Sequence, residues 1–172
     1  MTASNKKSRH RPATEVVHSG RDPTATHGFV NPPVYRGSTV LFPTVEKLWK
    51  RDQEYTYGRT CTPTVKALAD ALERVEGGAK TELTASGYQA VSTAIFAFVE
   101  TGDHILVSDS VYYPTRRFCD RLLTKLGVET TYYDPVMGTR IEKLVRQNTR
   151  LIFAESPGSQ TFEVQDIPAI SA

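Results

Sequence analysis

The chain has 172 residues, a length that fits one domain with a real hydrophobic core. Its 39% hydrophobic and 23% charged residues are typical of a globular protein, and its net charge of +2 is too small to indicate a nucleic-acid partner. No apolar run approaches the length that a bilayer requires, and Cys61 and Cys119 are too few for a disulfide framework. Neither cysteine has a metal-ligand spacing with a histidine, so we expect a cytoplasmic protein without a membrane partner or a zinc site.

Residues 1–60 are predicted to form an N-terminal arm and an irregular segment, because they carry weak periodicity and many Pro, Gly, Thr and Ser residues. The basic residues Lys6, Lys7, Arg9 and Arg11 fit a solvated, disordered arm better than a binding tail. Since no apolar stretch follows them, we expect no secretory signal. A short helix is predicted near 45–50.

A regular helical pattern begins at Pro63, which suits a first helical turn with Thr62 as its cap. Apolar residues at helical spacing follow, and Gly77 with Gly78 ends the predicted helix. An extended segment over 81–84 then leads into a second helix, because the apolar residues return to helical spacing from position 91 onward.

The rest of the chain alternates predicted strands and helices. These are strands over 104–108, 128–133 and 151–154, helices around 118–126 and 141–145, and the start of a helix after Asp166. The alternation predicts an α/β fold, with a mostly parallel, helix-flanked sheet in a domain that spans 61–172. Ligands of such sheets bind at the carboxyl ends of the strands. We therefore expect the turns after Leu83, Val107 and Ala154 to face one crevice.

The turn Ser86-Gly87-Tyr88 lies where the extended segment gives way to the second helix. Backbone N–H groups of Gly87 and Tyr88, at the positive end of a helix, could hold a phosphate with the Ser86 hydroxyl nearby. A tight turn that needs a glycine explains the same residues equally well. No GxGxxG or GxxxxGK pattern surrounds the turn, which disfavours dinucleotides and nucleoside triphosphates.

Three further motifs are candidates for a site in this crevice. Tyr57 and Arg59 lie two apart on an extended segment, where a hydroxyl and a guanidinium could grip one oxyanion, although most loop arginines are simply solvated. Tyr112 follows a predicted strand, where its ring could support a flat cofactor or pack over the sheet edge. Glu155, after another strand, could be a functional acid or cap a loop. The histidines are expected to be structural or surface groups, since no serine or cysteine is placed to form a triad with them.

In this order, the motifs resemble those of the pyridoxal-phosphate (PLP) dependent enzymes of cysteine and methionine metabolism, the transsulfuration family. The resemblance runs from about residue 14 to residue 172. Its markers are Tyr57-x-Arg59, Leu72-Glu73-Arg74-Val75-Glu76-Gly77-Gly78, Ser86-Gly87, Gly102-Asp103-His104, Asp109-x-x-Tyr112 and Glu155-Ser156-Pro157. The family pattern has asparagine where this chain has Thr62 and Ser159, and these departures favour the bacterial cystathionine β-lyase branch.

The resemblance implies a PLP-dependent aspartate-aminotransferase-like fold and gives the candidate residues roles. Gly87 and Tyr88 would donate backbone N–H groups to the cofactor phosphate. Tyr57 and Arg59 would reach that phosphate from the neighbouring subunit, and Tyr112 would stack on the pyridine ring. The resemblance also implies an amino-acid thioether substrate and a homo-oligomer, a tetramer built from dimers.

The reaction implied is β-elimination, which converts L-cystathionine to L-homocysteine, pyruvate and ammonia in methionine biosynthesis. In the family, the lysine that forms a Schiff base with PLP lies beyond the motifs matched here. None of the lysines present, including Lys66, Lys80 and Lys125, occupies a corresponding motif, so we expect a truncated, N-terminal part of the fold that has no catalytic residue and is inactive alone. Three alternatives stay open: a non-enzymatic remnant that associates with full-length relatives, a γ-synthase or γ-lyase of the same family, and a nucleotide-binding module.

Overall fold

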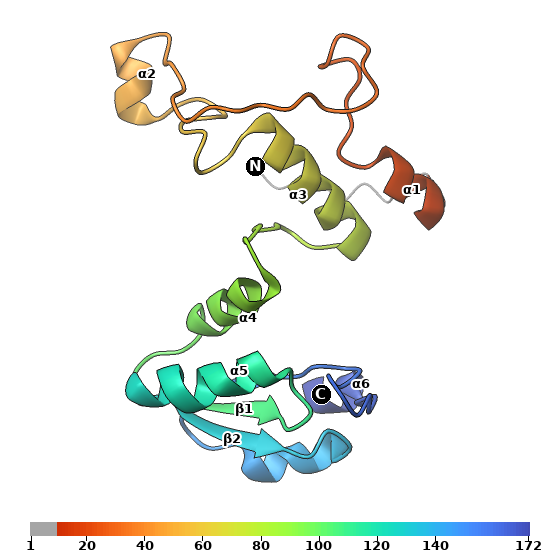
Figure 1. Ribbon diagram of the computed structural model, residues 1–172, viewed down its shortest axis with the longest axis vertical. Coiled ribbons are helices and arrows are strands. Elements are labelled where there is room, and N and C mark those ends of the chain that lie inside the picture. Colours follow the sequence, from red (N-terminus) through yellow and green to blue (C-terminus); the bar gives the residue numbers. More distant parts are fainter. Residues whose placement is uncertain (1–9) are drawn as a thin grey trace. The chain divides into compact units, whose positions relative to one another are not determined.

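The structure, a computed structural model, describes residues 10–172. Its contacts divide the chain into two compact units, Met1–Leu83 and Thr84–Ala172, both drawn in Figure 1. Of the predicted basic arm, Lys6, Lys7 and Arg9 lie outside the described residues. The predicted division into an arm and irregular segment over 1–60 and a domain over 61–172 stays a prediction.

Within its described residues, the first unit consists of helices and loops. The helices are α1 (Pro12–His18), α2 (Val45–Lys50) and α3 (Pro63–Glu76). α3 begins as predicted, because the Thr62 hydroxyl accepts a hydrogen bond from the N–H of Val65 at 3.3 Å. It ends at Gly77, whose φ of 69° is the left-handed conformation that glycine adopts most readily. α2 occupies the predicted range.

The sequence does not predict α1, because no clear periodicity marks it. The helix packs against α3, and Glu15 and Arg74 form an ion pair at 3.4 Å. A Cβ at Gly20 would lie 2.1 Å from the carbonyl oxygen of Ala67, so the glycine lets the chain approach α3 closely. A helix of seven residues is marginal by itself, so packing against α3 stabilises α1.

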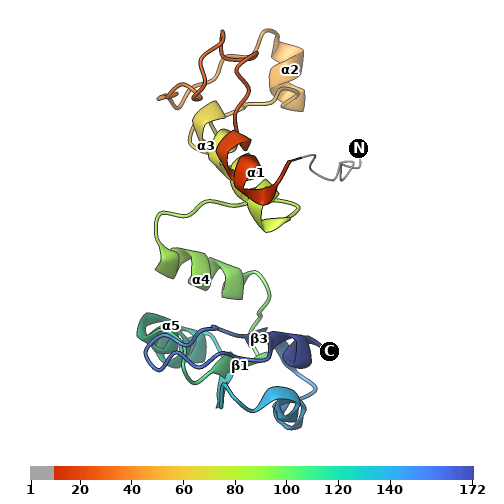
Figure 2. The same cartoon turned by 90° about the vertical axis from the view of Figure 1, so that its right-hand side faces the viewer.

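The second unit is a three-stranded parallel sheet with helices on both faces (Figures 1 and 2). The strand order is β2-β1-β3, so β1 lies in the centre. The elements in chain order are α4 (Gly87–Phe96), β1 (His104–Ser108), α5 (Tyr113–Phe118), η1 (Cys119–Leu123), β2 (Glu129–Tyr133), η2 (Gly138–Leu144), β3 (Thr149–Phe153) and α6 (Ile167–Ser171). The predicted α/β fold with a parallel, helix-flanked sheet is confirmed. No helix in the described part of the chain is both long and apolar enough to cross a membrane.

Two hydrophobic clusters fill the two faces of this sheet. Ile105 and Val107 of β1 join the cluster under α4, α5 and η1, whereas Leu106 joins the cluster under η2 and α6. Every residue of β1 is buried, because the strand has a neighbour on each side and helices above and below. The central strand therefore fixes where the loops after all three strands emerge.

Three predicted elements differ in the structure. Segment 81–84 pairs with no strand in residues 10–172, and without a hydrogen-bonding partner an extended segment is not a strand. The helix after β1 continues as the π-helix η1, because the N–H and the hydroxyl of Thr124 both donate to the carbonyl of Cys119. η2 is a 3-10 helix rather than an α-helix, and Ile141 and Leu144, three residues apart, lie on one face of it.

Candidate functional site

An open pocket of about 930 Å³ lies where the strands of the second unit end. Its walls include the turn Ser86-Gly87-Tyr88, Tyr112 after β1 and Glu155 after β3. The prediction that the three turns face one crevice is therefore confirmed. A pocket of this size is in the range of cofactor and small-molecule sites.

The wall formed by the start of α4 presents free backbone donors. Ser86 caps the helix, since its Oγ accepts a hydrogen bond from the N–H of Gln89 at 3.1 Å. Among the described residues, the N–H groups of Gly87 and Tyr88 have no acceptor. This wall therefore offers two N–H groups at the positive end of a ten-residue helix, a suitable place for an anion.

Gly87 has no local structural reason to be glycine. It is the first residue of α4, so its backbone is helical, and a Cβ placed on it would meet no atom of residues 10–172 within 4 Å. The explanation of a tight turn that needs a glycine is therefore wrong for this position. Because Gly87 has no side chain, its backbone is accessible from the pocket.

Tyr112 presents its ring to the same pocket, with 52% of the residue exposed. Its N–H donates to Oε2 of Glu155 at 3.1 Å, which joins the loop after β1 to the loop after β3. Glu155 therefore does hold a loop, one of the two roles expected for it. A half-exposed tyrosine beside free N–H groups suits a flat ring that carries an anionic group.

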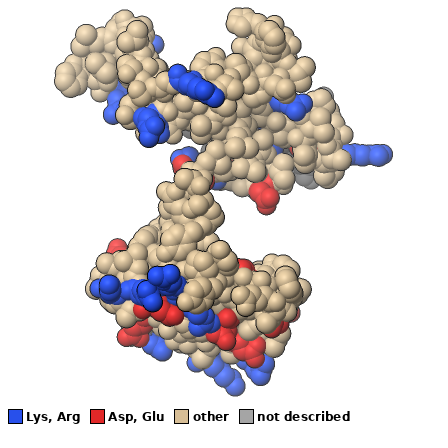
Figure 3. Space-filling model, viewed as in Figure 1, with Lys and Arg blue, Asp and Glu red and all other residues tan. Residues whose placement is uncertain are grey.

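Two arginines that the sequence analysis does not single out, Arg117 and Arg121, also line this pocket. They lie one turn apart on α5 and η1, both are exposed, and within the described chain neither forms an ion pair with a carboxylate. Figure 3 shows basic side chains gathered over α5. The signal that could have found Arg117 and Arg121 is their spacing of four residues from each other in the helix that follows Tyr112. Their positive charge raises the local concentration of anions.

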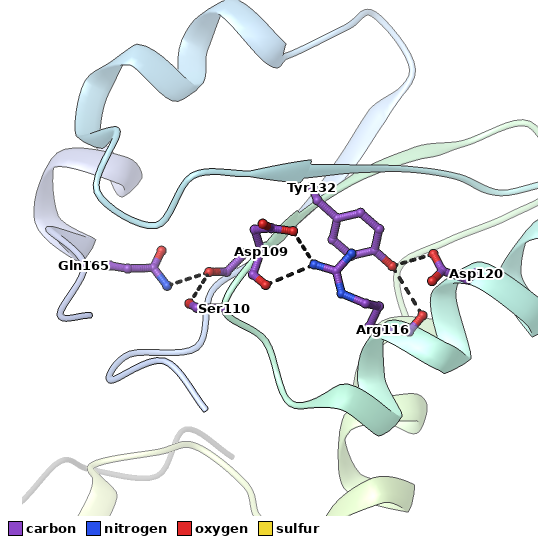
Figure 4. A network of polar contacts seen from close by, with 7 residues as sticks. Asp109, Ser110, Arg116, Asp120, Tyr132 and Gln165 are labelled. Carbon is purple, nitrogen blue, oxygen red and sulfur yellow. Dashed lines mark hydrogen bonds and ion pairs between the residues drawn. The ribbon is translucent and has the colours of Figure 1, made fainter. Parts of the chain in front are cut away.

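A third arginine, Arg116, belongs to a structural network instead (Figure 4). Its guanidinium lies 3.7 Å from the ring centroid of Tyr132, pairs with the carboxylate of Asp109, and donates to the Asp109 carbonyl at 3.0 Å. Tyr132 in turn donates to Asp120 at 2.7 Å. Burial and then this hydrogen bond raise the pKa of Tyr132 far above its ordinary value, so it stays a neutral donor.

Tyr57 and Arg59 belong to the first unit, and both are exposed. Between them, Gly58 donates to the carbonyl of Ser38 at 2.8 Å, and a Cβ there would lie 2.0 Å from the carbonyl oxygen of Gly37. This close approach fixes the backbone of the segment and explains its glycine. The anion-binding role of the two side chains stays a prediction.

His104 is structural, as expected. It is fully buried in β1, and its two ring nitrogens lie 2.8 Å from Thr149 Oγ1 and 2.9 Å from Thr131 Oγ1. Burial lowers its pKa below the ordinary value of 6.5. Over residues 10–172, no group of three His, Cys, Asp or Glu residues is arranged to hold a metal ion.

The second unit has an α/β fold with an open pocket, the candidate ligand site, at the carboxyl edge of its parallel sheet. Residues 13–172 match the model of the Cys/Met metabolism PLP-dependent enzyme family, and the chain belongs to this family.

Several other proteins are similar to the chain in sequence or in structure. It is 55% identical over 92% of its length to a putative cystathionine beta-lyase of Rhizobium johnstonii, and 43% identical over 92% to cystathionine beta-lyase MetC of Escherichia coli. It spans 40% and 42% of the lengths of these two relatives. The crystal structure of metB from Corynebacterium glutamicum matches 95% of the chain with a TM-score of 0.88 at 28% identity, and the chain covers 42% of it.

Proposed function

We propose that the start of α4 binds the phosphate of PLP. Gly87 is the observation that carries this proposal, because it leaves the backbone open where neither its conformation nor its neighbours require a glycine. The N–H groups of Gly87 and Tyr88 would donate to the phosphate. The Ser86 hydroxyl already accepts a bond from Gln89, so its own proton is available to a phosphate oxygen.

The proposed site has two further parts. The exposed ring of Tyr112 would stack on the pyridine ring of the cofactor, in the pocket that Arg117 and Arg121 also line. Tyr57 and Arg59 would reach the phosphate from a neighbouring copy in a homo-oligomer, which the exposure of both side chains permits. In the cytoplasm Cys61 and Cys119 would stay reduced, in keeping with their free state.

The reaction we propose for the protein to which these residues contribute is β-elimination of L-cystathionine. When bound, PLP supplies an electron sink for the pair left at the substrate Cα. In that reaction the substrate would lose its Cα proton as the Cβ–S bond breaks, and the sulfur would leave as L-homocysteine after it gains a proton. Water would then hydrolyse the remainder to pyruvate and ammonia. The residues described here bind and orient the cofactor. The names of the relatives at 55% and 43% identity support the β-lyase reaction, within methionine biosynthesis, over γ-synthase or γ-lyase chemistry.

Calorimetric titration of the 172-residue chain with pyridoxamine 5′-phosphate tests the phosphate site. This ligand carries an amine in place of the aldehyde, so it does not react with surface lysines. Pyridoxamine without phosphate is the matched control. We expect the phosphorylated ligand to bind at least about tenfold more tightly, since each hydrogen bond to a charged group contributes roughly 1.5 kcal/mol or more. Equal affinity for the two ligands would contradict the proposal.

Turnover is a separate measurement. With PLP added, we expect these 172 residues to release no pyruvate from L-cystathionine, because none of their lysines matches the family's Schiff-base position. Pyruvate release at a rate proportional to chain concentration would overturn this expectation.

A further inference from the structure

One buried side chain, Gln165, connects the ends of all three strands. Only 5% of it is exposed. Its Oε1 accepts from the Tyr133 hydroxyl at 2.7 Å, while its Nε2 donates to Ser108 Oγ at 3.1 Å and to the Glu155 carbonyl at 2.8 Å. Figure 4 shows this amide beside the end of β1. Tyr133 ends β2, Ser108 ends β1, and Glu155 follows β3, so one amide fixes the geometry of the whole edge.

Glu155 links the ends of the strands to the pocket. Gln165 holds its carbonyl, and the backbone N–H of Gln165 donates to the neighbouring Ser156 Oγ at 2.9 Å. With the main chain of Glu155 fixed, its carboxylate reaches across to accept the N–H of Tyr112 at 3.1 Å. A bond to an ionised acceptor is about twice as strong as a neutral one.

The ring of Tyr112 has little else to orient it. Within the described chain, no aromatic ring or cation packs against it, and its hydroxyl makes no hydrogen bond. Tyr112 is the cap residue of α5, and its side chain does not cap the helix. The direction of the ring therefore depends mainly on the Tyr112 backbone. Glu155 holds the N–H of that residue, and the Tyr112 carbonyl accepts from the N–H groups of Thr115 at 2.9 Å and Arg116 at 3.2 Å.

We propose that Gln165 and Glu155 are positioning residues, which orient the Tyr112 ring as a platform for a flat aromatic ligand. The identity of that ligand rests on the proposed function, but the positioning itself does not. Neither residue has to touch the ligand. Gln165 suits its role because an amide donates and accepts at once, whereas a carboxylate would meet the acceptor oxygen of Glu155 unfavourably.

The test compares Glu155→Ala with Glu155→Gln, with Glu142→Ala as the matched control at an exposed site on η2 outside the pocket. The glutamine variant keeps an acceptor for the Tyr112 N–H, and the alanine variant does not. Two NMR measurements need no ligand: hydrogen exchange of the Tyr112 amide, and the three-bond couplings that report its χ1 rotamer. In Glu155→Ala we expect exchange to rise about tenfold and the couplings to average over several rotamers, with both nearly restored in Glu155→Gln.

A third measurement is the induced circular dichroism of bound pyridoxamine 5′-phosphate. We expect Glu155→Ala to lose most of this signal while its affinity falls less than about threefold, since the phosphate donors are untouched. Should the unmodified chain not bind the ligand, the proposed function fails, and the NMR measurements still decide the positioning role. A single Tyr112 rotamer in Glu155→Ala, or an equal loss of order in Glu155→Gln, would overturn the inference. Gln165→Met should reproduce the alanine result, and the Glu155 pair decides the question even where this core variant does not fold.

Discussion

Replacement of Gly87 by alanine separates ligand binding from folding. In an α-helix alanine is more favourable than glycine by about 0.5–1 kcal/mol, partly because glycine has more freedom to lose on folding. Gly87 is the first residue of α4, and a methyl group there meets no atom of the described part of the chain within 4 Å. The free energy of unfolding should therefore stay equal or rise, by at most about 1 kcal/mol.

The same methyl group stands where a phosphate oxygen would approach. It blocks access to the N–H groups of Gly87 and Tyr88, which have no acceptor among the described residues. Each hydrogen bond to a charged group contributes about 1.5–3 kcal/mol. Loss of one or both hydrogen bonds should weaken binding of pyridoxamine 5′-phosphate by roughly 10-fold to 10,000-fold.

Urea unfolding and calorimetric titration on the same Gly87→Ala preparation measure both effects. The control is Gly78→Ala, because that glycine also has no atom within 4 Å of a built Cβ and does not line the pocket. Unchanged affinity in Gly87→Ala would refute the phosphate assignment. Lower stability would refute the conclusion that the fold does not require glycine at this position.

Three other predictions concern stability and charge. Because burial lowers the pKa of His104 below 6.5, the unfolded chain binds a proton at His104 more readily than the folded chain does, so the stability contributed by the neutral ring is complete above about pH 6.5 and is lost as the pH falls below it. The urea midpoint should therefore decline less in His104→Gln than in the unmodified chain as the pH is lowered from 6.5. An equal decline would contradict the lowered pKa of His104. Thr62→Ala removes the cap of α3 and should cost about 1 kcal/mol in urea unfolding, whereas a cost near zero would mean that solvent replaces the cap. Replacing both Arg117 and Arg121 by glutamine should weaken binding of pyridoxamine 5′-phosphate several-fold and reduce its salt dependence, and an unchanged salt dependence would show that their charge does not act on the ligand.

Local patterns in the sequence predict the elements whose cause is local. The cap at Thr62, the left-handed glycine at position 77 and the apolar run of β1 each act over a few residues, and all three lie where expected. The crevice is predictable for a related reason, since parallel strands place the loops after them at one edge. Ser86, Gly87 and Tyr112 come together there.

Elements that depend on contacts distant in the sequence are not predictable in this way. α1 depends on packing against α3, and segment 81–84 lacks the partner that would make it a strand. The π-helix η1 is an exception, because its cause is local, a bond from Thr124 to the Cys119 carbonyl, and yet hydrophobic spacing does not show it. Gln165 is the clearest case, because its partners are 9 to 57 residues away and its own neighbours carry no motif.

The glycines of this chain separate what folding requires from what a ligand requires. Gly20 and Gly58 allow backbone contacts that a Cβ would block, at 2.1 and 2.0 Å, and six glycines have a positive φ. Of the glycines with neither reason, Gly87 is the one that belongs to a regular helix, as its first residue, where its backbone suits any residue. In the middle of a helix glycine costs about 0.5–1 kcal/mol relative to alanine, and at the first residue of α4 the described residues give no folding reason to prefer glycine. The pocket beside it supplies a different reason: a bound anion that approaches the helix closer than a side chain would allow.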